Sequence, residues 1–326
     1  MSLKTKIKLA LLDNLVWVLL AAFFIANAFF TPAFLGMKNQ LNILYQSATL
    51  GLLVLGMGIV MMVGELDLSM EATLAFAPGI VILAARQLNM GPVACVLLTL
   101  VLGTVIGFFN GFFVAKLKTN SFLLTMSSQI VMRGLVLFLV PFSLAGLDKG
   151  YTFLGRGRIG AIQIAILVLI VVYIIFEFIF HKTVFGRKFT LTGGNRRAAY
   201  ISGINTDRVV IYAFMLAGLL SALAGLVTAG RQNAVSNSMG EGMVMMAFAG
   251  AILGGCSFNG GKGKPVGKAG GPIHWRHGQA CGNAGRHTAA GYDRQRAEPQ
   301  RGGCQSGQRN KGRPHLFGNS SGSAAL

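Results

Sequence analysis

Eight apolar runs separated by short polar connections constrain the fold of this chain more than any other feature. A membrane-spanning helix needs about 20 mostly apolar residues to cross about 30 Å of hydrocarbon. Because hydrocarbon offers the backbone no hydrogen-bond partners, each run is expected to be helical. The runs are Leu11–Phe30, Leu41–Val63, Ala72–Ala85, Pro92–Ala115, Ser121–Val140, Ile162–Phe180, Val209–Ala229 and Val244–Leu253.

The composition supports this assignment. Of the 326 residues, 53% are hydrophobic and 12% are charged, whereas a soluble domain has about 25% charged residues. This excludes an ordinary soluble enzyme, a disordered chain and a disulfide scaffold. The predicted fold is an all-α, polytopic bundle of transmembrane helices. Ala72–Ala85 and Val244–Leu253 are short, so they are expected to form broken or re-entrant helices.

Small residues within the runs predict where helices approach closely. Gly103 and Gly107 are four residues apart, and Ser221 and Gly225 repeat the spacing. Pairs of small residues at this spacing let two helix backbones come into contact. Packing is therefore the interpretation favoured over a hinge.

Basic residues in the short connections predict the orientation. Three lysines precede the first run, two lie in the turn Lys116–Lys118, and six basic residues lie in His181–Arg208. If every run crosses the membrane once, these segments share one side, which should be the cytoplasm. The chain is therefore expected to be a multi-pass membrane protein with a cytoplasmic N-terminus. The basic residues in 148–158, on the opposite side, count against this model.

Polar side chains interrupt the apolar runs at a few places. Glu65, Asp67 and Ser69 lie between two runs, and Asn110 lies within another. They form either an ordinary polar turn or a broken-helix motif that lines a pathway, with Asp67 or Ser69 capping the next helix. Arg133 lies deep in its run and should pair with a carboxylate or a carbonyl group.

The connection Gly186–Ile204 is basic, is broken by glycine and becomes helix-prone from Arg196. Such a loop is usually only a solvated charged face. Here Ala198 and Ala199 are followed by Gly203, which predicts a short helix with a flat face and a defined end. A helix of this kind can dock into a groove of a partner.

The stretch Gly250–Gly267 is rich in glycine and contains lysine, which raises the question of a phosphate-binding loop. Lys262 is followed by Gly263 and Lys264 by Pro265, so the Walker A pattern is absent. A tight turn in which backbones pack closely is predicted instead. We therefore expect no bound cofactor in this chain and no nucleotide site.

Four stretches of residues 1–267 together resemble the permease subunit of bacterial ABC importers of the ribose/xylose/autoinducer branch. Gly64-Glu65-Leu66-Asp67-Leu68-Ser69 is similar to a family motif, and so is Asn110-Gly111 followed by Phe122, Thr125 and Arg133-Gly134. The third stretch resembles the family's cytoplasmic coupling segment, with matching residues that include Asn195, Ala198, Ala199 and Gly203. The fourth resembles the family's glycine-rich turn, with matching residues that include Gly254, Gly255, Gly260 and Gly261. Two departures are Asn120-Ser121, where the family usually has proline, and Arg197, where related importers often have an acidic residue.

The resemblance implies a transport subunit of the bacterial inner membrane, without enzymatic activity, that moves a small polar solute, most often a sugar. It implies a separate ATPase that uses ATP and docks near Asn195–Gly203, a periplasmic binding protein, and a second permease copy or paralogue. Glu65, Asp67, Ser69 and Asn110 would then line the path or stabilise broken helices. The alternatives are an ion-coupled secondary transporter, in which Glu65 and Asp67 couple the ion, and an inactive truncated permease.

The sequence changes character after Gly267. Residues 268–326 carry nine Lys and Arg against two Asp and Glu, include 12 Gly, and contain no long apolar run where the resemblance implies further spans. Binding to nucleic acid or anionic lipid is one interpretation of such a basic tail. A metal site is another, but His274, His277, Cys281 and His287 match no standard zinc spacing. The favoured interpretation is a shifted reading frame, with no metal and no nucleic-acid partner.

Overall fold

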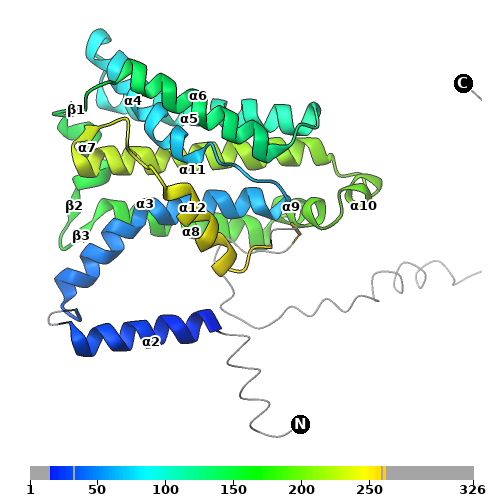
Figure 1. The fold of residues 1–326 in the computed structure, drawn as a ribbon, viewed down its shortest axis with the longest axis horizontal. Helices are drawn as coiled ribbons and strands as arrows, with labels where there is room; N and C mark the ends of the chain where they lie inside the picture. Colours follow the sequence, from blue (N-terminus) through cyan, green and yellow to red (C-terminus); the bar gives the residue numbers. More distant parts are fainter. Residues whose placement is uncertain (1–14, 32–33, 258–259, 262–326) are drawn as a thin grey trace, which may run out of the picture. The chain divides into compact units, whose positions relative to one another are not determined.

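The computed structural model describes residues 15–31, 34–257 and 260–261, and it is built almost entirely from helices (Figure 1). The seven longest helices are α2 (Leu15–Phe30), α3 (Met37–Met62), α4 (Met70–Leu88), α5 (Pro92–Lys116), α6 (Ser121–Leu139), α8 (Ile164–Lys182) and α11 (Thr206–Gln232). The shorter helices are α7 (Lys149–Arg156), α9 (Val184–Gly194), α10 (Arg196–Ile201) and α12 (Met243–Leu253). The all-α class is confirmed.

The strands of the described part of the chain are only two residues long. β1 (Leu144–Ala145) pairs antiparallel with β4 (Ala234–Val235), so that Leu144 lies opposite Val235. β2 (Arg158–Ile159) and β3 (Ile162–Gln163) form a small hairpin. Both pairs serve to join helix ends.

Every predicted apolar run corresponds to a helix. Within the described residues, α3, α4, α5, α6, α8 and α11 are long and apolar enough to cross a membrane. The expectation that Ala72–Ala85 forms a short helix is wrong, because polar residues at both ends, including Glu71 and Arg86, extend α4 to 19 residues. In contrast α12 has 11 residues, about 16 Å, which is roughly half of a membrane.

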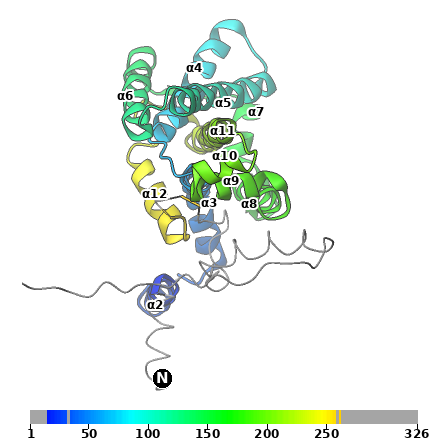
Figure 2. The same ribbon diagram turned by 90° about the vertical axis from the view of Figure 1, so that its right-hand side faces the viewer.

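α11 forms the centre of the bundle and packs against α3, α4, α5 and α7 (Figure 2). The predicted small-residue contacts lie here. A Cβ atom added to Gly107 would be 2.2 Å from the carbonyl oxygen of Phe214, and one added to Gly225 would be 2.3 Å from that of Leu74. Glycine is needed because main-chain atoms of neighbouring helices occupy the space of a side chain.

Two of the three basic connections lie at the same end of the bundle. Lys118 lies 2.8 Å from Asp207, and Lys116 lies 3.6 Å from the same carboxylate, which places the end of α5 beside the start of α11. β1, β4 and α7 lie at the opposite end of the bundle from α9 and α10 (Figure 1). The N-terminal lysines lie outside the described residues.

We predict that Gly107→Ala lowers the free energy of unfolding by about 1–3 kcal/mol, because its methyl group meets the backbone of α11. Gly134→Ala is the matched control, since a Cβ at this position of α6 has no atom within 4 Å. Thermal unfolding of the purified variants in detergent measures the difference. Equal melting temperatures would contradict the close α5–α11 contact.

Candidate functional site

The break between α3 and α4 contains a buried polar network. Asp67 Oδ1 accepts hydrogen bonds from the backbone N–H of Ser69, at 3.0 Å, and from its hydroxyl, at 2.5 Å. Asn110 Nδ2 donates to Ser69 Oγ at 2.8 Å, and Ser128 Oγ donates to Asn110 Oδ1 at 2.7 Å. Asp67 and Ser69 are each 1% exposed and Asn110 is 4% exposed. The structure therefore brings together three of the four predicted residues, Asp67, Ser69 and Asn110, inside the protein.

The first turn of α6 supplies the partners of the broken backbone. The N–H of Leu66 donates to Ser121 Oγ at 3.3 Å, and that of Leu68 donates to Thr125 Oγ1 at 3.1 Å. Asn120, which departs from the family's proline, caps this turn through hydrogen bonds from two backbone N–H groups of α6. The break is thus held by hydroxyl groups where the backbone leaves the helical pattern.

The capping expectation for α4 is only partly met. Ser69 occupies the N-cap position, but its side chain makes no capping bond because its hydroxyl donates to Asp67. Asp67 instead accepts the N–H of Ser69 two residues along the chain, as in an Asx turn.

Glu65 lies apart from this network. Its carboxylate forms an ion pair with Arg196, the first residue of α10, at 3.2 Å. The side chain of Glu65 is 15% exposed and that of Arg196 is 37% exposed. Glu65 therefore connects the break after α3 to the segment with the predicted docking helix.

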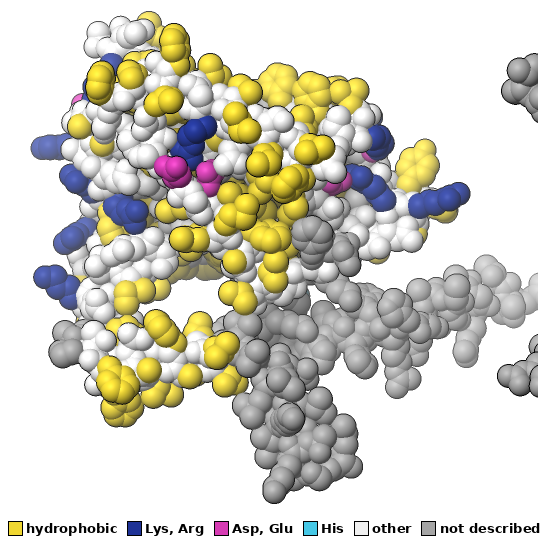
Figure 3. Space-filling model, viewed as in Figure 1, with side chains coloured by type: hydrophobic (Ala, Val, Ile, Leu, Met, Phe, Trp, Pro, Cys, Tyr) yellow, Lys and Arg dark blue, Asp and Glu magenta, His cyan; other side chains and the backbone are white. Residues whose placement is uncertain are grey.

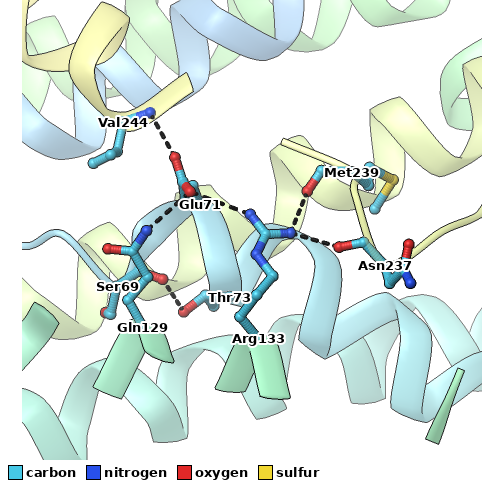
Figure 4. A network of polar contacts seen from close by, with 8 residues as sticks. All are labelled: Ser69, Glu71, Thr73, Gln129, Arg133, Asn237, Met239 and Val244. Atoms are coloured by element: carbon cyan, nitrogen blue, oxygen red, sulfur yellow. Dashed lines mark hydrogen bonds and ion pairs between the residues drawn. The ribbon is translucent and has the colours of Figure 1, made fainter. Parts of the chain in front are cut away.

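A second polar cluster surrounds Glu71, on the first turn of α4 (Figure 4). Glu71 Oε1 accepts hydrogen bonds from Gln129 at 2.9 Å and from Arg133 at 3.2 Å. Oε2 accepts the backbone N–H of Val244, at the start of α12, at 3.2 Å. Arg133 also donates to backbone carbonyl groups, so the sequence prediction that this residue pairs with a carboxylate or a carbonyl is confirmed.

Glycines from distant parts of the chain meet at the end of the bundle that carries α9 and α10. A Cβ added to Gly193 would lie 1.9 Å from the carbonyl oxygen of Met62, and one added to Gly260 would lie 2.8 Å from the Cα of Gly64. Gly261 N–H donates to the Met62 carbonyl at 3.0 Å. The glycine-rich turn therefore packs backbone against backbone, as predicted. Gly254 and Gly255 follow α12 directly and lead into this contact.

The predicted docking helix is present as α10. Asn195 caps it by accepting the N–H of Ala198 at 2.9 Å. The helix ends with a Schellman motif, in which Gly203 has φ 81° and its N–H donates to the carbonyl of Tyr200. Arg197 and Ala198 are exposed, whereas Ala199 is 4% exposed and anchors the helix.

Sequence reasoning missed several residues of these clusters. Tyr200 and Ile201 are 71% and 78% exposed and form the outer surface of α10 together with Ala198, whereas Ala199 is buried. Their exposure follows from the packing of the helix through Ala199. Gln129 bonds to Glu71 in the second cluster, and Ser128 bonds to Asn110 in the first. The available sequence signal was their position four and five residues before Arg133 on the same helix.

These features define a multi-pass membrane protein with a broken-helix core. The model of the branched-chain amino acid transport system permease component family matches residues 39–273. The chain belongs to this family, and its role is that of a transport permease.

Several curated relatives are named as import permeases. The chain is 37% identical to the ribose import permease protein of Bacillus subtilis strain 168 over 241 residues, which are 72% of this chain and 74% of the relative. It is 30% identical to the ribose import permease protein of Escherichia coli K12, over 73% of this chain and 75% of the relative. It is 36% identical to the autoinducer 2 import system permease protein of Salmonella paratyphi B, over 70% and 66% respectively. No solved structure matches the chain significantly.

We predict that Ser69→Ala destabilises the protein by about 1–3 kcal/mol, because Asn110 and Asp67 each lose a buried hydrogen-bond partner. Ser127→Ala is the matched control, since this exposed hydroxyl bonds only to a carbonyl of its own helix. Thermal unfolding in detergent reports both variants. A Ser69→Ala protein as stable as the control would show that the network contributes little.

Proposed function

We propose that this chain is the membrane-spanning permease subunit of an ATP-driven importer, and that the small polar solute it carries is a sugar. The single observation that carries the proposal is family membership over residues 39–273, together with relatives named as ribose and autoinducer 2 import permeases. The bundle of apolar helices supports the same role, because it provides the membrane path that an importer requires.

The energy for transport comes from a separate ATPase that docks on α10. The exposed surface of this short helix combines Tyr200, Ile201 and Arg197, while the buried Ala199 fixes the helix to the bundle. Two exposed large side chains beside a cation form a compact contact surface of the kind that fits a partner's groove. A nucleotide motif is absent from this sequence, which is consistent with ATP being used by the partner.

A periplasmic binding protein delivers the solute, and a second permease copy or paralogue completes the path. The end of the bundle with α9 and α10 faces the cytoplasm in this proposal, and the N-terminus lies on the same side. The excess of basic residues at that end supports the orientation.

The polar groups of the break have distinct roles. Asp67, Ser69 and Asn110 bond to one another and are buried, so they stabilise the broken backbone and do not touch the solute. Glu65 ties the break to α10 through Arg196. A movement of the docking helix therefore reaches the end of α3 directly.

The tail, residues 268–326, is the product of a shifted reading frame. The family match extends only to residue 273, close to the change in composition at Gly267. A genuine tail would bind anionic lipid or nucleic acid through its basic residues, but its lack of a regular pattern favours the frameshift.

We predict that the double variant Tyr200→Asp, Ile201→Asp lowers co-purification of the ATPase by at least about tenfold, because two carboxylates replace the apolar contact. ATP-dependent ribose uptake by proteoliposomes of the assembled complex should fall in proportion. Phe153→Asp is the control, since this exposed side chain of α7 lies at the other end of the bundle.

Two results would contradict the importer. The first is full ATPase binding by the double variant. The second is uptake by the wild-type complex that collapses with a protonophore while ATP is held constant, which would favour the ion-coupled transporter.

A further prediction concerns the gene. Reading the DNA in a shifted frame from about codon 267 should restore an apolar sequence of about 20 residues or more, because a permease span is expected there. Sequencing of the genomic locus and translation in all three frames provide the check. A shifted frame that stays polar or stops early would contradict the frameshift.

A further inference from the structure

The segment 236–242, which connects β4 to α12, crosses the bundle without regular secondary structure (Figure 1). It begins beside β4 and ends where the half-membrane helix α12 starts. Non-helical backbone at membrane depth is tolerated only where it is enclosed by protein or lines a water-filled cavity. Its hydrogen-bond partners therefore decide what holds this segment in place.

One residue, Arg133, provides the hydrogen bonds recorded between this segment and other elements in the described part of the chain. Arg133 Nη1 donates to the carbonyl groups of Asn237, at 2.7 Å, and Met239, at 3.1 Å. Just beyond the segment, Glu71 accepts the N–H of Val244, the second residue of α12. The other backbone bonds recorded for 236–242 are short-range turns. We call Glu71 and Arg133 the clasp.

The clasp lies deep in the bundle, yet its arginine is partly exposed at the bundle surface. Arg133 lies 12 residues after the start of α6 and six before its end, about 18 Å along the helix. Its side chain is 24% exposed, against 7% for Glu71. Figure 3 shows basic and acidic side chains grouped in the middle of a largely hydrophobic face. A partly exposed ion pair at this depth is costly against lipid, so the face must border water or another protein.

We infer that Arg133 is a positioning residue for transport: neutralised by Glu71, it holds the backbone of Asn237–Met239 as a wall of the solute path. The inference rests on the proposed function and names the backbone segment that lines the solute path. Arginine suits the task because its planar group donates to a carboxylate and to two carbonyl oxygens at once. Gln129 fixes the carboxylate from the same helix.

Cysteine labelling tests the positioning. Met239 is 2% exposed, so Met239→Cys in the otherwise unchanged full chain should resist a membrane-impermeant maleimide. Adding Arg133→Gln should raise the labelling rate at residue 239 by at least about tenfold, because the freed segment opens to water. Membrane fragments are labelled and then cleaved after glutamate. Residue 239 then lies in a peptide that ends at Glu241 and contains none of the native cysteines, so mass spectrometry of this peptide reports position 239 alone.

Ser221→Cys is the control for loss of the whole fold, because Ser221 is fully buried in α11, on a different helix from the clasp. It should stay unlabelled in the Arg133→Gln background. Continued protection of residue 239 overturns the inference, and so does labelling of both positions, since the arginine would then stabilise the bundle as a whole. Ready labelling of Met239→Cys with Arg133 intact also overturns it.

Two further variants separate the carbonyl bonds from the ion pair. Arg133→Lys keeps a charge and N–H donors, so residue 239 should remain protected to within about threefold. The exchange Glu71→Arg, Arg133→Glu keeps the ion pair but removes donors from position 133, so residue 239 should become reactive. Protection by the exchanged pair would show that charge pairing alone is sufficient and would overturn the inference.

Transport provides the functional readout. The Arg133→Gln complex should take up radiolabelled ribose at least about tenfold more slowly than wild type, with equal amounts of assembled complex. Uptake at the wild-type rate overturns the inference. If the wild-type complex carries no ribose and no other sugar, the proposed function fails, and the labelling experiment still decides whether Arg133 positions the segment.

Discussion

A bilayer core supplies no hydrogen-bond donors or acceptors, so backbone groups released by a helix break must find partners within the protein. Both irregular segments of this bundle obey that constraint. The break after α3 is satisfied by the hydroxyls of Ser121 and Thr125, and the segment before α12 is satisfied by Arg133. In both cases the partners come from α6, whose hydroxyl groups accept hydrogen bonds from the break and whose arginine donates to the segment before α12. The polar residues of α6, spaced four apart from Ser121 to Arg133, therefore determine where the bundle can depart from regular helices.

The same constraint separates two kinds of polar residue. Asp67, Ser69 and Asn110 bond to one another and leave the hydrocarbon environment unperturbed. Glu71 and Arg133 balance their charges, but they also reach the surface of the bundle. The fully buried network contributes stability and a fixed shape. The partly exposed ion pair also places a charged side chain on a face that is otherwise apolar.

Much of this arrangement could be predicted from the sequence. Hydropathy located each membrane helix because a span needs a minimum apolar length, and the spacing of small residues marked positions on α5 and α11 where helices approach closely, but not which helices meet there. The partners of Arg133 were predicted as chemical types, but Asn237 and Met239 could not be named, because neither is adjacent in sequence and both act through backbone atoms. The length of α4 was missed because Glu71 and Arg86 are polar and lie in the helix only through tertiary contacts. The exposure of Tyr200 and Ile201 depends on how α10 packs, which local sequence does not determine.

The glycine junction of Met62, Gly193 and Gly261 has a mechanical consequence. Its atoms are all main chain, and they touch without intervening side chains. Side chains can absorb a displacement by changing rotamer, but backbone packed on backbone cannot. A displacement of α9 at this junction therefore requires the last turn of α3 and the turn after α12 to move with it, because no side chain lies between them to change its rotamer.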